Sequence, residues 1–110
     1  MTKITDISHH TMVQYKDTCA NQTQVRKLKN GDLLAVFNQE RYPFHHDTGQ
    51  TVMTRSKDGG ITWSEPTVVV PWSQTTGSWD CGICELNDGT LIINFNICGF
   101  FKRGMKPNQP

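Results

Sequence analysis

A pattern of residues that occurs twice in this chain predicts two similar β-hairpins. One copy has Asn30-Gly31 between apolar segments, and the other has Asp88-Gly89 in the same setting. Both pairs favour a tight turn, because both turn positions must tolerate positive φ. The copies are 58 residues apart, and the aligned positions are Leu28 with Leu86, Leu33 with Leu91, Phe37 with Phe95 and Asn38 with Asn96. Such a repeat is typical of stacked or radial architectures, whose units cannot bury their apolar faces alone.

The segments between the two hairpins are also typical of β-structure. No segment carries a helical period over more than two turns, whereas residues 50–55 alternate and residues 63–70 are rich in β-forming side chains. We therefore predict an all-β fold of antiparallel four-stranded units, one complete and one partial. The predicted strands of the complete unit are 22–29, 32–39, 50–56 and 62–70.

The chain is predicted to form one partial assembly over residues 1–110, with no separate domains. Residues 1–19 form an N-terminal segment in which Thr11–Lys16 is expected to be an extra strand. The complete unit spans 20–70, and residues 79–98 form the start of the partial second unit. The tail 99–110 is expected to be a loop. Proline at two positions of that tail disfavours regular structure.

Charge and composition exclude some classes of function. The chain has 11 Lys and Arg against 10 Asp and Glu, a formal net charge of +1. This argues against a nucleic-acid-binding surface and against a polybasic membrane anchor. The N-terminus lacks the apolar stretch of a secretory signal and no segment is long enough to span a bilayer, which predicts a cytoplasmic protein. Only 35% of the residues are hydrophobic, which predicts a small core.

Four cysteines, at positions 19, 81, 84 and 98, leave more than one interpretation open. The Cys81-Gly82-Ile83-Cys84 motif has the spacing of a redox pair or of half a zinc site. However, the spacing to Cys98 fits no zinc pattern, and the motif leads into a predicted strand instead of a helix that would lower a thiol pKa. We therefore favour buried structural thiols and predict no metal and no cofactor.

The segment from Ser56 to Trp63 has a third, more specific pattern, Ser-x-Asp-x-Gly-x-Thr-Trp. Asp58 can accept backbone hydrogen bonds within its own turn, and Gly60 permits positive φ. The hydroxyls of Ser56 and Thr62 can bond across the turn, and Trp63 offers a large apolar face. Each of these five residues therefore has a structural role in a turn.

This motif resembles the Asp-box of the sialidase-like (BNR-repeat) six-bladed β-propellers. The resemblance covers roughly residues 20–98 and includes both hairpins and the segment Ser64–Val69. It implies four-stranded propeller blades, of which the chain would supply the N-terminal blade and about half of the next. It also implies that the Asp-box is structural and lies on the side of the propeller opposite the sugar-binding end.

The resemblance places candidate site residues in the loops at that sugar-binding end. Glu40, Arg41 and Asp47 approximate the acidic residue, the arginine and the acid/base aspartate of sialidases, which makes Asp47 the candidate general acid. His46 in the same loop is a candidate ligand-binding residue. Trp72 and Trp79 are expected at this end too, where they would stack on sugar rings or pack between blades.

The chain also departs from the sialidase pattern. The first arginine of the carboxylate-binding triad would lie near Asn21, where the sequence reads Asn-Gln-Thr. The other arginines, the nucleophilic tyrosine and its glutamate belong to later blades. The resemblance therefore implies a carbohydrate-binding or glycoside-hydrolase-related fragment that is catalytically incomplete as a single chain. If active, it would be a sialidase-like glycoside hydrolase.

Two alternatives remain open at this point. The chain could be a non-enzymatic module that self-assembles or binds a protein, or it could be a truncated gene product without activity. Because fewer than two blades leave an open sheet edge, we also expect a homo-oligomer. A trimer is expected, since three copies of 110 residues would supply 330 residues, enough for a six-bladed sialidase-like propeller.

Overall fold

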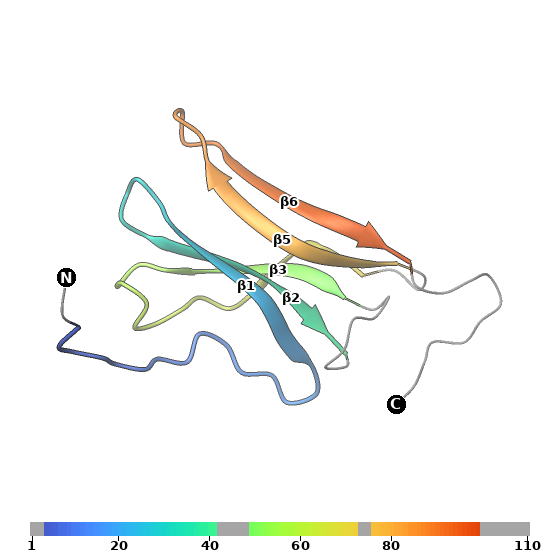
Figure 1. Ribbon diagram of the computed structural model, residues 1–110, viewed down its shortest axis with the longest axis horizontal. Coiled ribbons are helices and arrows are strands. Elements are labelled where there is room, and N and C mark those ends of the chain that lie inside the picture. The colour runs from blue at the N-terminus through green and yellow to red at the C-terminus, as the bar shows by residue number, and fades with distance from the viewer. Residues whose placement is uncertain (1–3, 42–48, 73–75, 100–110) are drawn as a thin grey trace.

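The structure is a computed structural model that describes residues 4–41, 49–72 and 76–99 (Figure 1). Its described residues are all-β, with antiparallel strands and no helix. A four-stranded sheet has the order β1-β2-β3-β4, and a two-stranded sheet is formed by β5 and β6. The strands are β1 (Cys19–Lys27), β2 (Leu33–Glu40), β3 (Gln50–Ser56), β4 (Thr67–Val70), β5 (Gly77–Glu85) and β6 (Leu91–Cys98).

No helix of the described residues is long and apolar enough to cross a membrane. Of the expected loop-like tail 99–110, residues 100–110 lie outside the described part of the chain.

The sequence repeat is also a repeat of backbone structure. Strands β1 and β2 pair in the same register as β5 and β6 once 58 is added to each residue number. Both pairs contain a β-bulge at the same place, with positive φ at Gln22 (51°) in one and at Asp80 (48°) in the other. The side chains of the two bulges also contact each other, because Gln22 Nε2 donates to Asp80 Oδ1 at 2.7 Å.

The two hairpin turns are alike in detail. Gly31 and Gly89 have φ of 92° and 86°, which a residue with a Cβ rarely adopts. The N–H of each glycine donates to the carbonyl of the leucine three residues earlier, at 2.9 and 3.1 Å. The two predicted hairpins are therefore present, but the expectation of positive φ at both turn positions is wrong, since Asn30 and Asp88 do not have positive φ.

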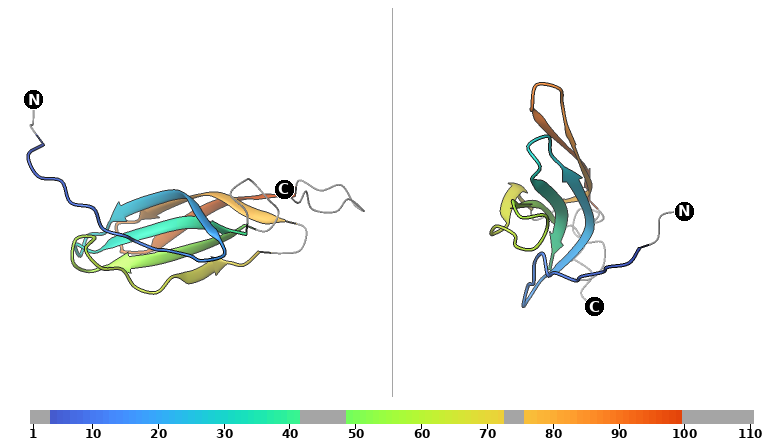
Figure 2. Two further views of the ribbon diagram at one scale, coloured as in Figure 1. Left: turned by 90° about the horizontal axis from the view of Figure 1, so that it is seen from below. Right: turned by 90° about the vertical axis from the view of Figure 1, so that its left-hand side faces the viewer.

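The two-stranded sheet packs on one face of the four-stranded sheet, mainly through β5 (Figures 1 and 2). The covered face of β2 carries Leu34, Val36, Asn38 and Glu40, all at most 1% exposed. Asn38 Nδ2 donates to the carbonyl of Ser78 in β5, and the Ser78 and Thr51 hydroxyls lie 2.8 Å apart. Polar contacts thus fix the position of β5 on a partly apolar surface.

The N-terminal segment lies on the opposite face of the four-stranded sheet. The ring of Tyr15 packs against that of Phe37, with 6.5 Å between their centroids. The expected strand at Thr11–Lys16 is wrong, because residues 4–18 contain no strand. This segment covers the sheet face with side chains and does not extend either sheet by backbone pairing.

The Asp-box forms the turn between β3 and β4. Asp58 accepts hydrogen bonds from Ser56 Oγ at 2.7 Å and from the N–H of Thr62 at 2.9 Å, and it also accepts one from the Thr62 hydroxyl. These bonds hold the pKa of Asp58 well below its usual range, the side-chain bond from Thr62 most of all. Gly60 has φ of 98°, and Trp63 Nε1 donates to its carbonyl at 3.1 Å.

Strand β4 is shorter than the sequence pattern suggested. The expected strand 62–70 is reduced to Thr67–Val70. Thr62 and Trp63 are engaged in the Asp-box turn, and the N–H of Ser64 donates to the carbonyl of Arg55. Pro66 lacks an N–H, so the ladder with β3 begins only after it.

The Asp-box turn gives a first testable prediction. We expect Asp58→Ala to lower the midpoint of thermal unfolding, because it removes the acceptor for three donors of the turn. The control is Lys57→Ala, which changes an exposed neighbour in the same turn. Thermal unfolding followed by circular dichroism makes the measurement. Equal midpoints for the two variants would show that these bonds do not stabilise the fold.

Candidate functional site

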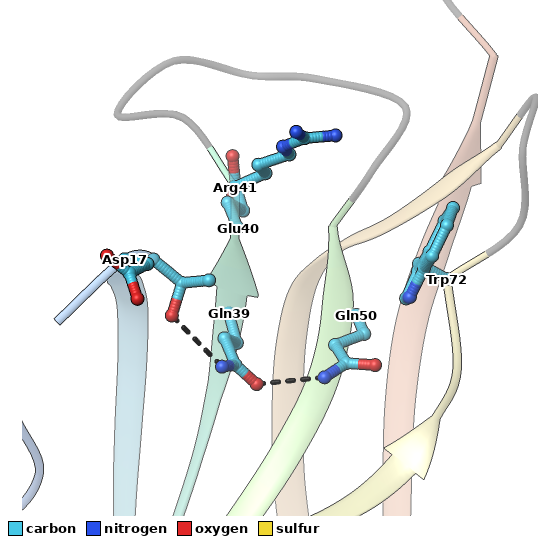
Figure 3. Close-up of a pocket in the computed structure, with 7 residues that line it drawn as sticks. Asp17, Gln39, Glu40, Arg41, Gln50 and Trp72 are labelled. Carbon is cyan, nitrogen blue, oxygen red and sulfur yellow. Dashed lines mark hydrogen bonds between the residues drawn. The ribbon is translucent and has the colours of Figure 1, made fainter. Parts of the chain in front are cut away.

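A pocket of about 350 Å³ lies at the end of the four-stranded sheet where β2 ends and β3 begins (Figure 3). This end is opposite the Asp-box, which connects the other end of β3 to β4. Three separate parts of the chain meet here, namely the residues just before β1, the end of β2 with the start of β3, and the segment after β4. The lining residues are Asp17, Thr18, Gln39, Glu40, Arg41, Gln50 and Trp72.

Two glutamine side chains form an ordered polar row on the pocket wall. Gln50 Nε2 donates to Gln39 Oε1 at 2.8 Å, and Gln39 Nε2 donates to Thr18 Oγ1 at 3.0 Å (Figure 3). Gln39 and Gln50 are paired across β2 and β3, so their side chains leave the same face of the sheet. The row holds both amides in one orientation, which prepares them to bind a polar ligand.

An exposed aromatic ring and two charged side chains complete the pocket lining. Trp72 is 52% exposed, and its indole stands beside the pocket after β4 (Figure 3). Asp17 and Arg41 are exposed and also line the pocket. A flat aromatic face together with amide, carboxylate and guanidinium groups can bind a ligand that has both apolar faces and hydroxyl groups.

Glu40 lines the same pocket, but its carboxylate is buried. The side chain is fully buried, and neither carboxylate oxygen has a hydrogen-bond partner among the described residues. Burial raises its pKa from 4.5 to about 7, and the nearby side chain of Asn21 partly offsets this shift. Glu40 therefore gains or loses its proton near neutral pH.

Glycine at position 49 allows this close packing around Glu40. A Cβ at Gly49 would lie 3.2 Å from the carbonyl oxygen of Ser78 and 3.4 Å from Glu40 Cγ. The N–H of Ser78 donates to the carbonyl of Gly49 at 3.0 Å, which ties the start of β3 to β5. Glu40 is thus enclosed where the two sheets and the pocket meet.

The structure brings together some of the predicted site residues. Glu40 and Arg41 both line the pocket, as expected for the end of the second strand. Trp79 is only 2% exposed, so it packs inside the protein and does not offer a stacking surface to a ligand. Asp47, the candidate acid, and His46 fall within 42–48, outside the described residues.

Sequence reasoning missed Asp17, Thr18, Gln39 and Gln50 as site residues. Gln39 adjoins the candidate residue Glu40, but no motif in the sequence marks Asp17, Thr18 or Gln50. The register that places Gln39 opposite Gln50 is not visible before the strands are paired.

The cysteines do not form a metal site in the part of the chain that the structure describes. Residues 4–41, 49–72 and 76–99 bring together no group of three His, Cys, Asp or Glu side chains able to hold a metal. Cys19, Cys81 and Cys84 are free thiols. Cys81 is buried, as expected, and burial raises its pKa. Cys84 is exposed, so the expectation of a buried thiol is wrong there.

Comparison with models of known protein families gives no match, and comparison with curated proteins gives no match either.

The buried carboxylate leads to a prediction about pH. Below about pH 4.5, Glu40 is protonated in both the folded and the unfolded chain, so its burial carries no ionisation cost. Between about pH 4.5 and 7 only the folded chain keeps the proton, and the free energy of unfolding falls as the pH rises. We therefore expect Glu40→Gln to stabilise the protein at pH 8 by up to about 3 kcal/mol and to change little at pH 4.

Urea unfolding of the parent and the variant at the two pH values measures this difference. Glu65→Gln is the matched control, because Glu65 is exposed and the same chemical change there should have the same small effect at both pH values. A Glu40→Gln effect that does not depend on pH would mean that Glu40 is not protonated in the folded protein at neutral pH.

Proposed function

We propose that this chain is a carbohydrate-binding module built from sialidase-like propeller blades, with the pocket beside Trp72 as its glycan site. The observation that carries the proposal is the lining of this pocket, where an exposed indole faces an ordered row of side-chain amides. Sugar rings combine apolar C–H faces, which stack on aromatic rings, with hydroxyl groups that bind amides and charged side chains.

Three features support the propeller part of the proposal. One four-stranded antiparallel sheet is followed by a hairpin that repeats its first two strands in the same register. The Asp-box forms the turn between β3 and β4, where the resemblance puts it in a blade. The pocket lies at the other end of the strands, which is the sugar-binding end implied by the resemblance.

We propose binding without catalysis by the single chain. Asn21 stands where the resemblance would require the first carboxylate-binding arginine, and its side chain lies near the buried Glu40. A guanidinium that captures a carboxylate in bidentate fashion is therefore missing at this position. Neutral sugars, which need amide and aromatic contacts, suit the described lining better than sialic acid.

The binding proposal is tested with a panel of neutral and acidic oligosaccharides by glycan array and isothermal titration calorimetry. We expect Trp72→Ala to weaken binding by about tenfold, because loss of ring stacking removes about 1.4 kcal/mol. Trp72→Phe should restore part of the affinity. Leu86→Ala, at an exposed apolar residue in the distant β5–β6 turn, is the control. Absence of binding to every glycan, or unchanged binding by Trp72→Ala, would refute the proposal.

A fluorogenic glycoside panel tests the absence of catalysis. We expect no hydrolysis by the purified chain above the uncatalysed rate. Hydrolysis that is lost in Asp47→Ala but kept in Trp72→Phe would instead make the chain a glycoside hydrolase with Asp47 in the mechanism.

A further inference from the structure

We propose that the outer face of the β5–β6 sheet binds strand β1 of a second copy of this chain, head to tail. The outer face consists of Asp80, Ile92, Asn94 and Asn96, and the front face of β1 consists of Ala20, Thr23 and Val25. The proposed contact repeats between two molecules the packing that β5 makes on the first sheet within one molecule. It rests on the structural repeat and is independent of glycan binding.

Within one chain, β5 covers the first sheet by contacting β1, β2 and β3. Two residues of β5 make specific polar contacts there. Ser78 accepts a hydrogen bond from Asn38 through its carbonyl, and the Cys81 thiol lies 3.8 Å from Asn38 Oδ1. Leu34 in β2 is covered to 1% exposure by this packing. The face of the first sheet that carries Leu34 and Asn38 is therefore covered by β5.

The equivalent face of the second unit is open on β6 but not on β5, where Trp79, the partner of Asn96, is 2% exposed. Ile92 is the equivalent of Leu34, since both occupy the same register position 58 residues apart, and it is 45% exposed. Asn96 is the equivalent of the fully buried Asn38 and is exposed. No strand of the described residues pairs with the second edge of β6. On the β6 side, the second unit therefore presents the binding face of the repeat with no strand of the described residues packed on it.

The front face of β1 is the matching surface. Ala20, Thr23 and Val25 are the register equivalents of Ser78, Cys81 and Ile83, the β5 residues on the side that meets the first sheet. All three are exposed, and Val25 is 54% exposed. Tyr15 of the N-terminal segment covers Phe37 in β2 and leaves this part of β1 open.

The polar contacts of the internal interface have counterparts in the proposed one. The bond from Gln22 to Asp80 joins two positions that are 58 residues apart, so Gln22 of a second copy can donate to Asp80 in the same way. Asn96 can donate to the carbonyl of Ala20, as Asn38 does to Ser78. The Thr23 hydroxyl can donate to Asn96 Oδ1, as the Cys81 thiol does to Asn38. Within one chain Asn96 Nδ2 already donates to Asp80 Oδ2 at 3.3 Å, so Asn96 would use its second N–H for the bond to Ala20 of the second copy.

The contact is heterologous, because the front face of one molecule meets the outer face of another. Each molecule has one face of each kind, so an open assembly keeps one free face at each of its two ends. It can therefore grow until it closes into a ring, or it remains an open stack. The bond between the Ser78 and Thr51 hydroxyls has no counterpart in the proposed contact, because Ala20 stands at the position of Ser78 and has no hydroxyl. We therefore expect association that depends on concentration.

Sedimentation velocity over about two orders of magnitude in protein concentration tests the association. We expect the average mass of the parent chain to rise with concentration, and Val25→Lys and Ile92→Lys each to stay at monomer mass. The matched controls are Val68→Lys and Ile61→Lys, which place the same charge at exposed apolar residues outside both faces. Thermal unfolding and circular dichroism confirm that each variant is folded.

A mixing experiment identifies the head-to-tail geometry. Val25→Lys keeps an intact outer face and Ile92→Lys keeps an intact front face. Mixed in equal amounts, they should form a one-to-one dimer that does not grow further, since no free intact pair of faces remains. Neither variant alone should dimerise.

Three results would overturn the proposal. In the first, the parent chain stays monomeric over the whole concentration range. In the second, the Val25→Lys and Ile92→Lys variants each associate as strongly as the parent chain. The third is a parent that associates while the mixed variants form no dimer. That outcome would point to a symmetric contact, such as pairing between two β6 edges, in place of the head-to-tail one.

Discussion

The packing of β5 across β1, β2 and β3 is the contact on which the rest of the structure depends. Much of it is polar, since Asn38, Thr51 and Ser78 are buried and bonded to one another between the sheets. Apolar burial alone tolerates sliding, whereas a buried amide without its partner costs roughly 1–3 kcal/mol. The polar contacts therefore select one position of β5, and this position closes the space around Glu40.

Local signals in the sequence predicted most of the strands. The two hairpins were predictable because Gly31 and Gly89 supply the positive φ that each turn requires. The errors came from segments where side chains decide the outcome. The N-terminal stretch around Tyr15 has a strand-like pattern but is held by ring contact with Phe37, and β4 starts late because Thr62 is bonded to Asp58. The Asp-box motif indicated the bond of Thr62, whereas the contact of Tyr15 with Phe37 has no signature in the local pattern.

The candidate site was predictable only in outline. The end of the second strand marked Glu40 and Arg41, and both line the pocket. Whether a side chain at such an end faces solvent or a neighbouring sheet depends on the register and on packing between sheets. This is why Glu40 is buried with a raised pKa, and why Trp79 is enclosed while Trp72 is open. The amide row needed the pairing of Gln39 with Gln50, which spans a loop.

The repeat explains why one chain has both a covered and an uncovered version of the same face. Leu34 and Val36 are buried in the first unit, whereas their equivalents Ile92 and Asn94 are exposed in the second. Asn94 occupies the position in the second unit that Val36 occupies in the first. The exposed face is therefore more polar than the buried one, which lowers nonspecific hydrophobic association. The amides of Asn94 and Asn96 also restrict which surfaces can cover it, because every buried amide requires a partner. A face of this kind favours a specific occupant that is bound reversibly over irreversible aggregation.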